Sequence, residues 1–76
     1  MSLTQELADK LAEDTFKVMK ATGDERFYME VAKVIGASST TLEEAFLTSV
    51  RVRLAEQRAR RFITDRLSEI ARDKGA

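Results

Sequence analysis

The chain has 76 residues, no cysteine, no histidine and a formal net charge of zero. A chain of this length forms one domain at most, so we expect residues 1–76 to make a single helical domain with a modest core. Without cysteine and histidine, disulfides, zinc fingers and haem ligation by the usual side chains are excluded, and no cofactor is expected. So small a core contributes little net stability. We therefore expect association with a second protein chain to provide additional stability.

The composition predicts an all-α fold. Proline is absent, glycine occurs three times, and the strong helix formers Ala, Leu, Glu, Lys and Arg dominate. We expect two shorter helices and one long C-terminal helix, at about 2–22, 25–35 and 42–73. No apolar run approaches the roughly 18 residues of a membrane span, and the N-terminus lacks the apolar segment of a signal peptide. A cytoplasmic protein without a membrane partner is predicted.

The first predicted helix has clear signals at both ends. Ser2 and Gln5 stand at capping-box spacing, and the helix is expected to end near Thr22, before Gly23. Asp14 projects into the apolar stripe, either as a misfit at an exposed edge or as the partner of a buried arginine. The expected stripe consists of Leu3, Leu7, Leu11, Val18 and Ala21, and it is widened by Ala8, Ala12, Phe16 and Met19.

The second predicted helix is short. Asp24 is its expected N-cap and Gly36 its expected C′ residue, just beyond the last turn. The polar segment 37–40 then forms a loop. The apolar face expected for this helix consists of Phe27, Tyr28, Val31, Val34 and Ile35.

The third predicted helix is the longest. A capping box is available at its start, from Thr40 with Glu43 or from Thr41 with Glu44. From about residue 42 to residue 73 it would measure roughly 48 Å, whereas the first helix reaches only about 30 Å. The first helix is therefore too short to cover it.

The apolar stripe of this long helix changes side along its length. Phe46 and Val50 are typical of the first stripe, and Ile63 and Ile70 of a second one rotated by more than about 100°. Either the helix breaks near residues 55–59, or it is continuous and its halves pack against different partners. The absence of Gly, Pro or a capping signal there favours the continuous helix. A symmetric homodimer is then the simplest cover for the second stripe.

The arginines cluster around the segment where the apolar stripe of the third helix changes side. Residues 1–50 carry nine acids and five bases, a net charge of −4, whereas residues 51–61 carry five arginines against one glutamate, a net charge of +4. Arg51, Arg58 and Arg61 project to one side of a helix and would suit phosphate or carboxylate groups. A nucleic-acid reader usually carries net positive charge and stacking aromatics, and only Phe62 is nearby. Contacts to acidic groups of this chain or a partner, or an ordinary solvated face, are the favoured interpretations.

Catalytic and metal sites are not predicted. A nucleophile needs a base, histidine is absent, and capping explains the hydroxyl groups at 38–41. Asp65, Glu69 and Asp73 stand at i, i+4, i+8, which could form a carboxylate ladder for a metal ion. Interleaved arginines favour a solvated, salt-bridged face instead. We therefore expect a non-enzymatic protein.

One segment resembles a known family. Phe46-Leu47-Thr48 and Arg53-Leu54-Ala55-Glu56 look like the Phe-x-Ser and Arg-Leu-Ala-Glu segments of the small Hha-type bacterial modulators. The resemblance covers 11 of the 76 residues, from 46 to 56. It implies a helical regulator of similar length that acts by binding a nucleoid protein.

Together these patterns predict a helical interaction or regulatory protein that acts as a homodimer through the C-terminal half of its third helix. The alternative is a nucleic-acid-associated regulator, or an adaptor for an acidic protein, that uses Arg51, Arg58 and Arg61. The predicted dimer interface consists of Val52, Ala59, Phe62, Ile63, Leu67 and Ile70.

Overall fold

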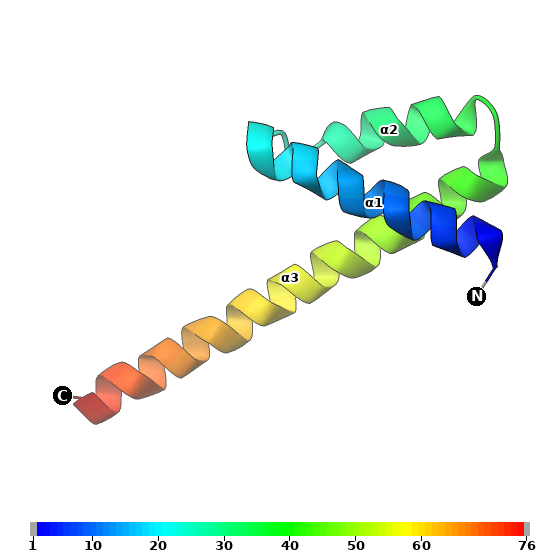
Figure 1. Cartoon of the computed structure of the whole chain (residues 1–76). Helices are drawn as coiled ribbons and strands as arrows, with labels where there is room; N and C mark the ends of the chain where they lie inside the picture. Colours follow the sequence, from blue (N-terminus) through cyan, green and yellow to red (C-terminus); the bar gives the residue numbers. More distant parts are fainter. Residues whose placement is uncertain (1, 76) are drawn as a thin grey trace.

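The computed structural model describes residues 2–75 and contains three helices and no strand within that range (Figure 1). They are α1 (Leu3–Thr22), α2 (Phe27–Gly36) and α3 (Thr40–Gly75). α1 and α2 run in opposite directions and form a helical hairpin that packs on the first half of α3, while the second half projects alone. The all-α prediction of two shorter helices and one long one is confirmed.

The ends of α1 follow the sequence signals. The Ser2 hydroxyl oxygen accepts a hydrogen bond from the Gln5 backbone N–H at 3.1 Å, which satisfies one of the free donors of the first turn. Gly23 has φ 76°, and its N–H donates to the Met19 carbonyl at 2.8 Å. Glycine occupies this left-handed position without the steric cost that a Cβ would add.

The predicted caps of α2 are both wrong. The Asp24 carboxylate accepts from the Arg26 N–H at 3.0 Å, so it closes a turn before the helix, which begins at Phe27. Gly36 is the last residue of α2, and its φ is not positive. A Cβ on Gly36 would lie 2.7 Å from the Glu43 carboxyl carbon. The flexible end of the Glu43 side chain thus lies against Gly36 and would have to move to admit a Cβ.

The start of α3 also differs from the prediction. The helix begins at Thr40, and the Ser39 hydroxyl oxygen accepts from the Leu42 N–H at 3.1 Å. Ser39 is thus the N-cap, in place of Thr40 or Thr41. α3 then continues without interruption through residues 55–59 to Gly75, which confirms the continuous helix and excludes the break.

The core lies where the three helices meet. Phe46 and Val50 of α3 are fully buried against Ala8 and Ala12 of α1 and Ala32 of α2. Alanines at these positions let the helix backbones approach the large Phe46 ring closely. The core is accordingly small, and it involves only the first half of α3.

The buried face of α1 lies toward one edge of the predicted stripe, the edge that contains Ala8 and Ala12. Leu3, Leu7 and Val18 are exposed, whereas Ala8, Ala12 and Thr15 are buried. The buried Thr15 hydroxyl donates to the Leu11 carbonyl at 2.7 Å, so this polar group is satisfied inside its own helix. The prediction included the two alanines but centred the stripe on the larger apolar residues, whereas the contact with α3 buries small side chains.

The molecule is much more extended than a compact domain of its length. Its dimensions are 57 × 29 × 13 Å and its radius of gyration is 16.4 Å, against about 11.4 Å expected for 76 residues. Its accessible surface is 6066 Å², against about 4,700 Å² expected for a compact monomer of this mass. Both excesses arise from the projecting half of α3. Within residues 2–75, no helix is long and apolar enough to cross a membrane.

Candidate interaction surface on the long helix

The second half of α3 has no covering element. All side chains from residue 55 to residue 75 are exposed, whereas Phe46 and Val50, on the same helix, have no exposed surface. We call residues 55–75 the free half. A helix normally buries its apolar side against another element, so an apolar stripe on the free half is a candidate contact surface.

Such a stripe is present. At about 100° per residue, four apolar residues fall within an arc of about 40° on one side of α3. Ile63 is 51% exposed and Val52 is 63% exposed, so these side chains contact water over most of their surface. We call this set the free stripe; Val52 lies just before the free half, and the other three members, Ala59, Ile63 and Ile70, lie within it.

The two remaining residues of the predicted interface flank the free stripe. Leu67 lies on one side of it and Phe62 on the other, and they are 61% and 69% exposed. The structure thus leaves all six predicted interface residues uncovered and accessible, with Phe62 at one edge rather than in the centre.

Two charged residues interrupt the free stripe. Glu56 and Arg66 occupy positions on the same side of α3. The Glu56 carboxylate lies 3.4 Å from the Arg60 Nε, and the Arg66 Nε lies 3.8 Å from the Glu69 carboxylate. All four side chains are more than half exposed. Exposed pairs of this kind contribute little stability, so both charges are available to a partner.

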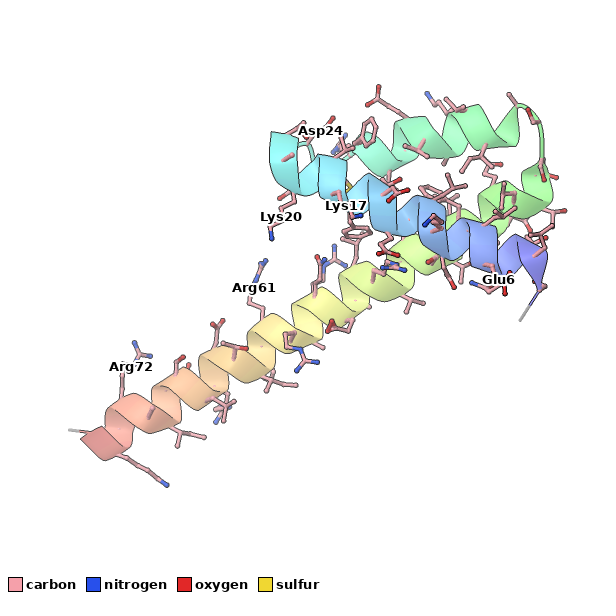
Figure 2. The ribbon with its side chains drawn as sticks, in the orientation of Figure 1. Glu6, Lys17, Lys20, Asp24, Arg61 and Arg72 are labelled. Carbon is pink, nitrogen blue, oxygen red and sulfur yellow. The ribbon has the colours of Figure 1, made fainter. Side chains whose placement is uncertain are left out.

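Of the three arginines predicted to bind acidic groups, two lie near the hairpin of α1 and α2. Arg58 and Arg61 line an open groove together with Lys17 and Lys20 from the end of α1. Figure 2 shows the Lys20 and Arg61 side chains directed toward one another across this groove. Arg51 does not line it. Six basic residues and three acidic ones line it, so we call it the basic groove. Its lining also includes the apolar residues Phe16, Met19, Val52 and Leu54, the aromatic Tyr28, and the acids Glu13, Glu25 and Glu56.

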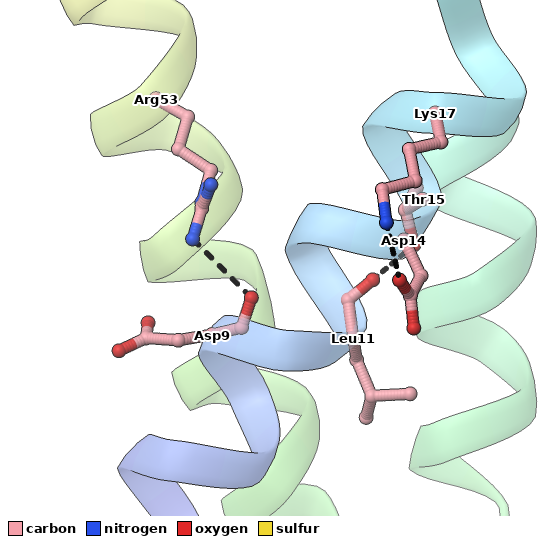
Figure 3. Close-up of polar contacts among 6 residues, drawn as sticks. All are labelled: Asp9, Leu11, Asp14, Thr15, Lys17 and Arg53. Atoms are coloured by element: carbon pink, nitrogen blue, oxygen red, sulfur yellow. Dashed lines mark hydrogen bonds and ion pairs between the residues drawn. The ribbon is translucent and has the colours of Figure 1, made fainter.

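A polar contact between α1 and α3 was not predicted. The Ser49 hydroxyl donates to the Asp9 carboxylate at 2.8 Å. The Arg53 Nη2 donates to the Asp9 carbonyl at 3.3 Å (Figure 3). The Arg53 Nε also donates to the Ser49 hydroxyl oxygen at 3.4 Å. The available signal was Ser49, a hydroxyl residue on the otherwise apolar face of α3 that contains Phe46 and Val50.

Asp14 does not make the interhelical contact considered for it. Its side chain is 62% exposed, and its carboxylate lies 3.6 Å from the Lys17 Nζ (Figure 3). The interpretation of Asp14 as a misfit at an exposed edge is therefore correct, and its interpretation as the partner of a buried arginine is wrong. The arginine that hydrogen-bonds to α1 is instead Arg53, whose Nη2 donates to the Asp9 carbonyl.

The free stripe and the basic groove are the two surfaces that the geometry offers for function. The first would bind an apolar helix, and the second would bind negatively charged groups. Comparison with protein-family models, with curated proteins and with solved structures found no match for this chain.

Proposed function

We propose that this protein is a non-enzymatic interaction or regulatory module that works as a homodimer, paired through the free half of α3. The observation that carries the proposal is the free stripe: apolar residues at helical spacing, all accessible, on a helix that the rest of the chain does not cover. A second copy presents the same stripe, and a self-complementary surface closes as a two-fold dimer.

The exposed area is sufficient for such a dimer. The accessible surface exceeds that of a compact monomer by about 1,400 Å², and a standard interface buries about 800 Å² per partner. Burial of the free stripe would also supply the additional core that a chain of this size needs. The dimer would then leave both hairpins exposed for contacts with other proteins.

Ile63 is the central residue of the free stripe, and the first test replaces it. An Ile63→Asp variant would place a carboxylate in the seam between the two copies, where burial of an unpaired charge is costly. Sedimentation equilibrium at micromolar concentration is expected to show a dimer for the unchanged protein and a monomer for the variant. Thermal unfolding of the variant is expected at a lower temperature, because dimerisation stabilises the fold.

Ser68→Asp is the matched control. It adds the same charge to the same half of α3, but on the side that faces away from the free stripe. It is expected to remain dimeric and to unfold at the temperature of the unchanged protein. A well-folded monomer for the unchanged protein would contradict the proposal outright.

A second candidate function rests on the basic groove. The structure places Lys17 and Lys20 beside Arg58 and Arg61, although they are far apart in the sequence. Phosphate groups of a nucleic acid would suit this arrangement, and such binding weakens steeply as salt rises. A duplex DNA or RNA is expected to shift in a gel at about 50 mM salt. The double variant Arg58→Ala, Arg61→Ala is expected to bind with an affinity that depends less steeply on salt concentration. No shift would remove nucleic acid and leave an acidic protein as the partner for the groove.

A further inference from the structure

We propose that the two copies of α3 pair in antiparallel orientation, with the two-fold axis passing near residue 61. This inference rests on the homodimer proposed above and adds the direction and register of the pairing. The evidence is the order of apolar, small and charged residues along the free stripe.

The stripe follows the heptad spacing of a coiled-coil seam. From Val52 to Ile70, residues on this side recur at alternating spacings of four and three. The seam positions in order are Val52, Glu56, Ala59, Ile63, Arg66 and Ile70. Four positions are apolar and two carry opposite charges, so the partner must place compatible side chains opposite each of them.

Antiparallel pairing about residue 61 gives each seam residue a suitable neighbour. In a two-fold interface, when one residue contacts a second residue of the other copy, the reverse contact also occurs. Val52 then faces Ile70 of the partner subunit. Ala59 faces the partner's Ile63, so that a small side chain meets a large one. Glu56 faces Arg66 of the partner subunit, and each charge meets its opposite.

Parallel pairing would place identical residues opposite one another. The two copies of Glu56 would meet, and so would the two copies of Arg66, which gives two layers of like charge in one seam. The two copies of Ala59 would also leave a gap. Like charges placed together across an interface are strongly unfavourable, whereas an opposite pair sets direction and register. Charge and size therefore both favour the antiparallel arrangement.

The flanks of the seam agree with this register. Because the axis passes near residue 61, Phe62 of each copy lies beside the axis on the same edge, and the two rings can pack together. At the far end, Ile70 of the partner subunit reaches Val52, which lines a shallow hollow between α1 and α3 with Gln5 and Asp9. The hairpin leaves this side of Val52 open, since Val52 is 63% exposed.

A charge exchange tests which residues face one another. Glu56→Lys would place a lysine opposite the partner's Arg66 and is expected to raise the dimer dissociation constant by about tenfold or more. Arg66→Glu is expected to do the same. The combined variant restores opposite charges across the seam, so its dissociation constant is expected to return to within about threefold of the original. Arg72→Glu, on the outer side of α3, is the control and is expected to change little.

Distance measurement tests the direction of the helices. The chain has no cysteine, so Lys74→Cys accepts a single spin label near the exposed end of α3. In the antiparallel dimer, residue 74 lies level with residue 48 of the other copy, and the two labels are about 39 Å apart along the axis. In a parallel dimer the labels would lie side by side, within about 20 Å.

The outcomes separate this inference from the proposed homodimer. A monomer in sedimentation equilibrium would overturn both. A dimer with labels close together, or one that the combined charge exchange fails to restore, would overturn the antiparallel register alone. A dimer with distant labels and restored affinity would support both.

Discussion

At the scale of single residues, Asp9, Ser49 and Arg53 join α1 to α3 through polar atoms beside the apolar core. Asp9 is half-buried and Ser49 is 7% exposed, so water competes only weakly for these hydrogen bonds. A polar group that loses its partner at such a depth costs more free energy than one at the surface.

Asp9→Ala tests the contribution of this contact. It removes the acceptor for the Ser49 hydroxyl and is expected to lower the free energy of unfolding by about 1–2 kcal/mol. Asp14→Ala is the matched control, because Asp14 is exposed and pairs only with Lys17; its expected effect is below about 0.5 kcal/mol. Urea unfolding of both variants at one protein concentration gives the comparison. Equal effects would show that the contact does not stabilise the fold.

Caps and polar contacts show the limit of sequence reasoning at this scale. Ser2 and Gly23 were predicted because each acts within its own turn. Ser39 was passed over because three neighbouring hydroxyl residues offered the same cap, and the choice depends on where the loop meets α2. Gly36 was misassigned because glycine usually marks the position just beyond a helix, whereas here it is the last residue of α2 and its φ is not positive.

At the scale of elements, α3 divides into a half that the hairpin covers and a half that it leaves free. Helix number, order and the continuity of α3 were predicted, because composition and breakers act locally. Which edge of the α1 stripe is buried was not predicted, since it depends on how closely the backbones of α1 and α3 approach each other. The change of side along α3 was visible in the sequence because apolar residues mark both of its faces.

Two phenylalanines of α3 test this division. Phe46 has no exposed surface, and Phe46→Ala is expected to cost about 3–5 kcal/mol, as much as the whole core of so small a domain provides. Circular dichroism should then show loss of helix. Phe62 is 69% exposed, so Phe62→Ala is expected to keep the helical signal and to weaken only the dimer. Unfolding of both variants alike would contradict the division.

At the scale of the whole molecule, the shape follows from the mismatch between a 20-residue and a 36-residue helix. The hairpin covers one end, and no further element of the described residues 2–75 is available for the other. The sequence predicted this mismatch from helix lengths alone. The basic groove could not be predicted in the same way, because it depends on the angle at which the hairpin crosses α3.

The uninterrupted backbone of α3 has a mechanical consequence. Kinks in helices arise at proline, glycine pairs or inserted residues, and α3 contains none of these between Thr40 and Lys74. The helix is therefore stiff over about 54 Å. A partner bound near its C-terminal end is therefore held at a fixed distance and orientation relative to the hairpin, so α3 acts as a rigid spacer. A force or torque applied at one end of the helix is transmitted to the other.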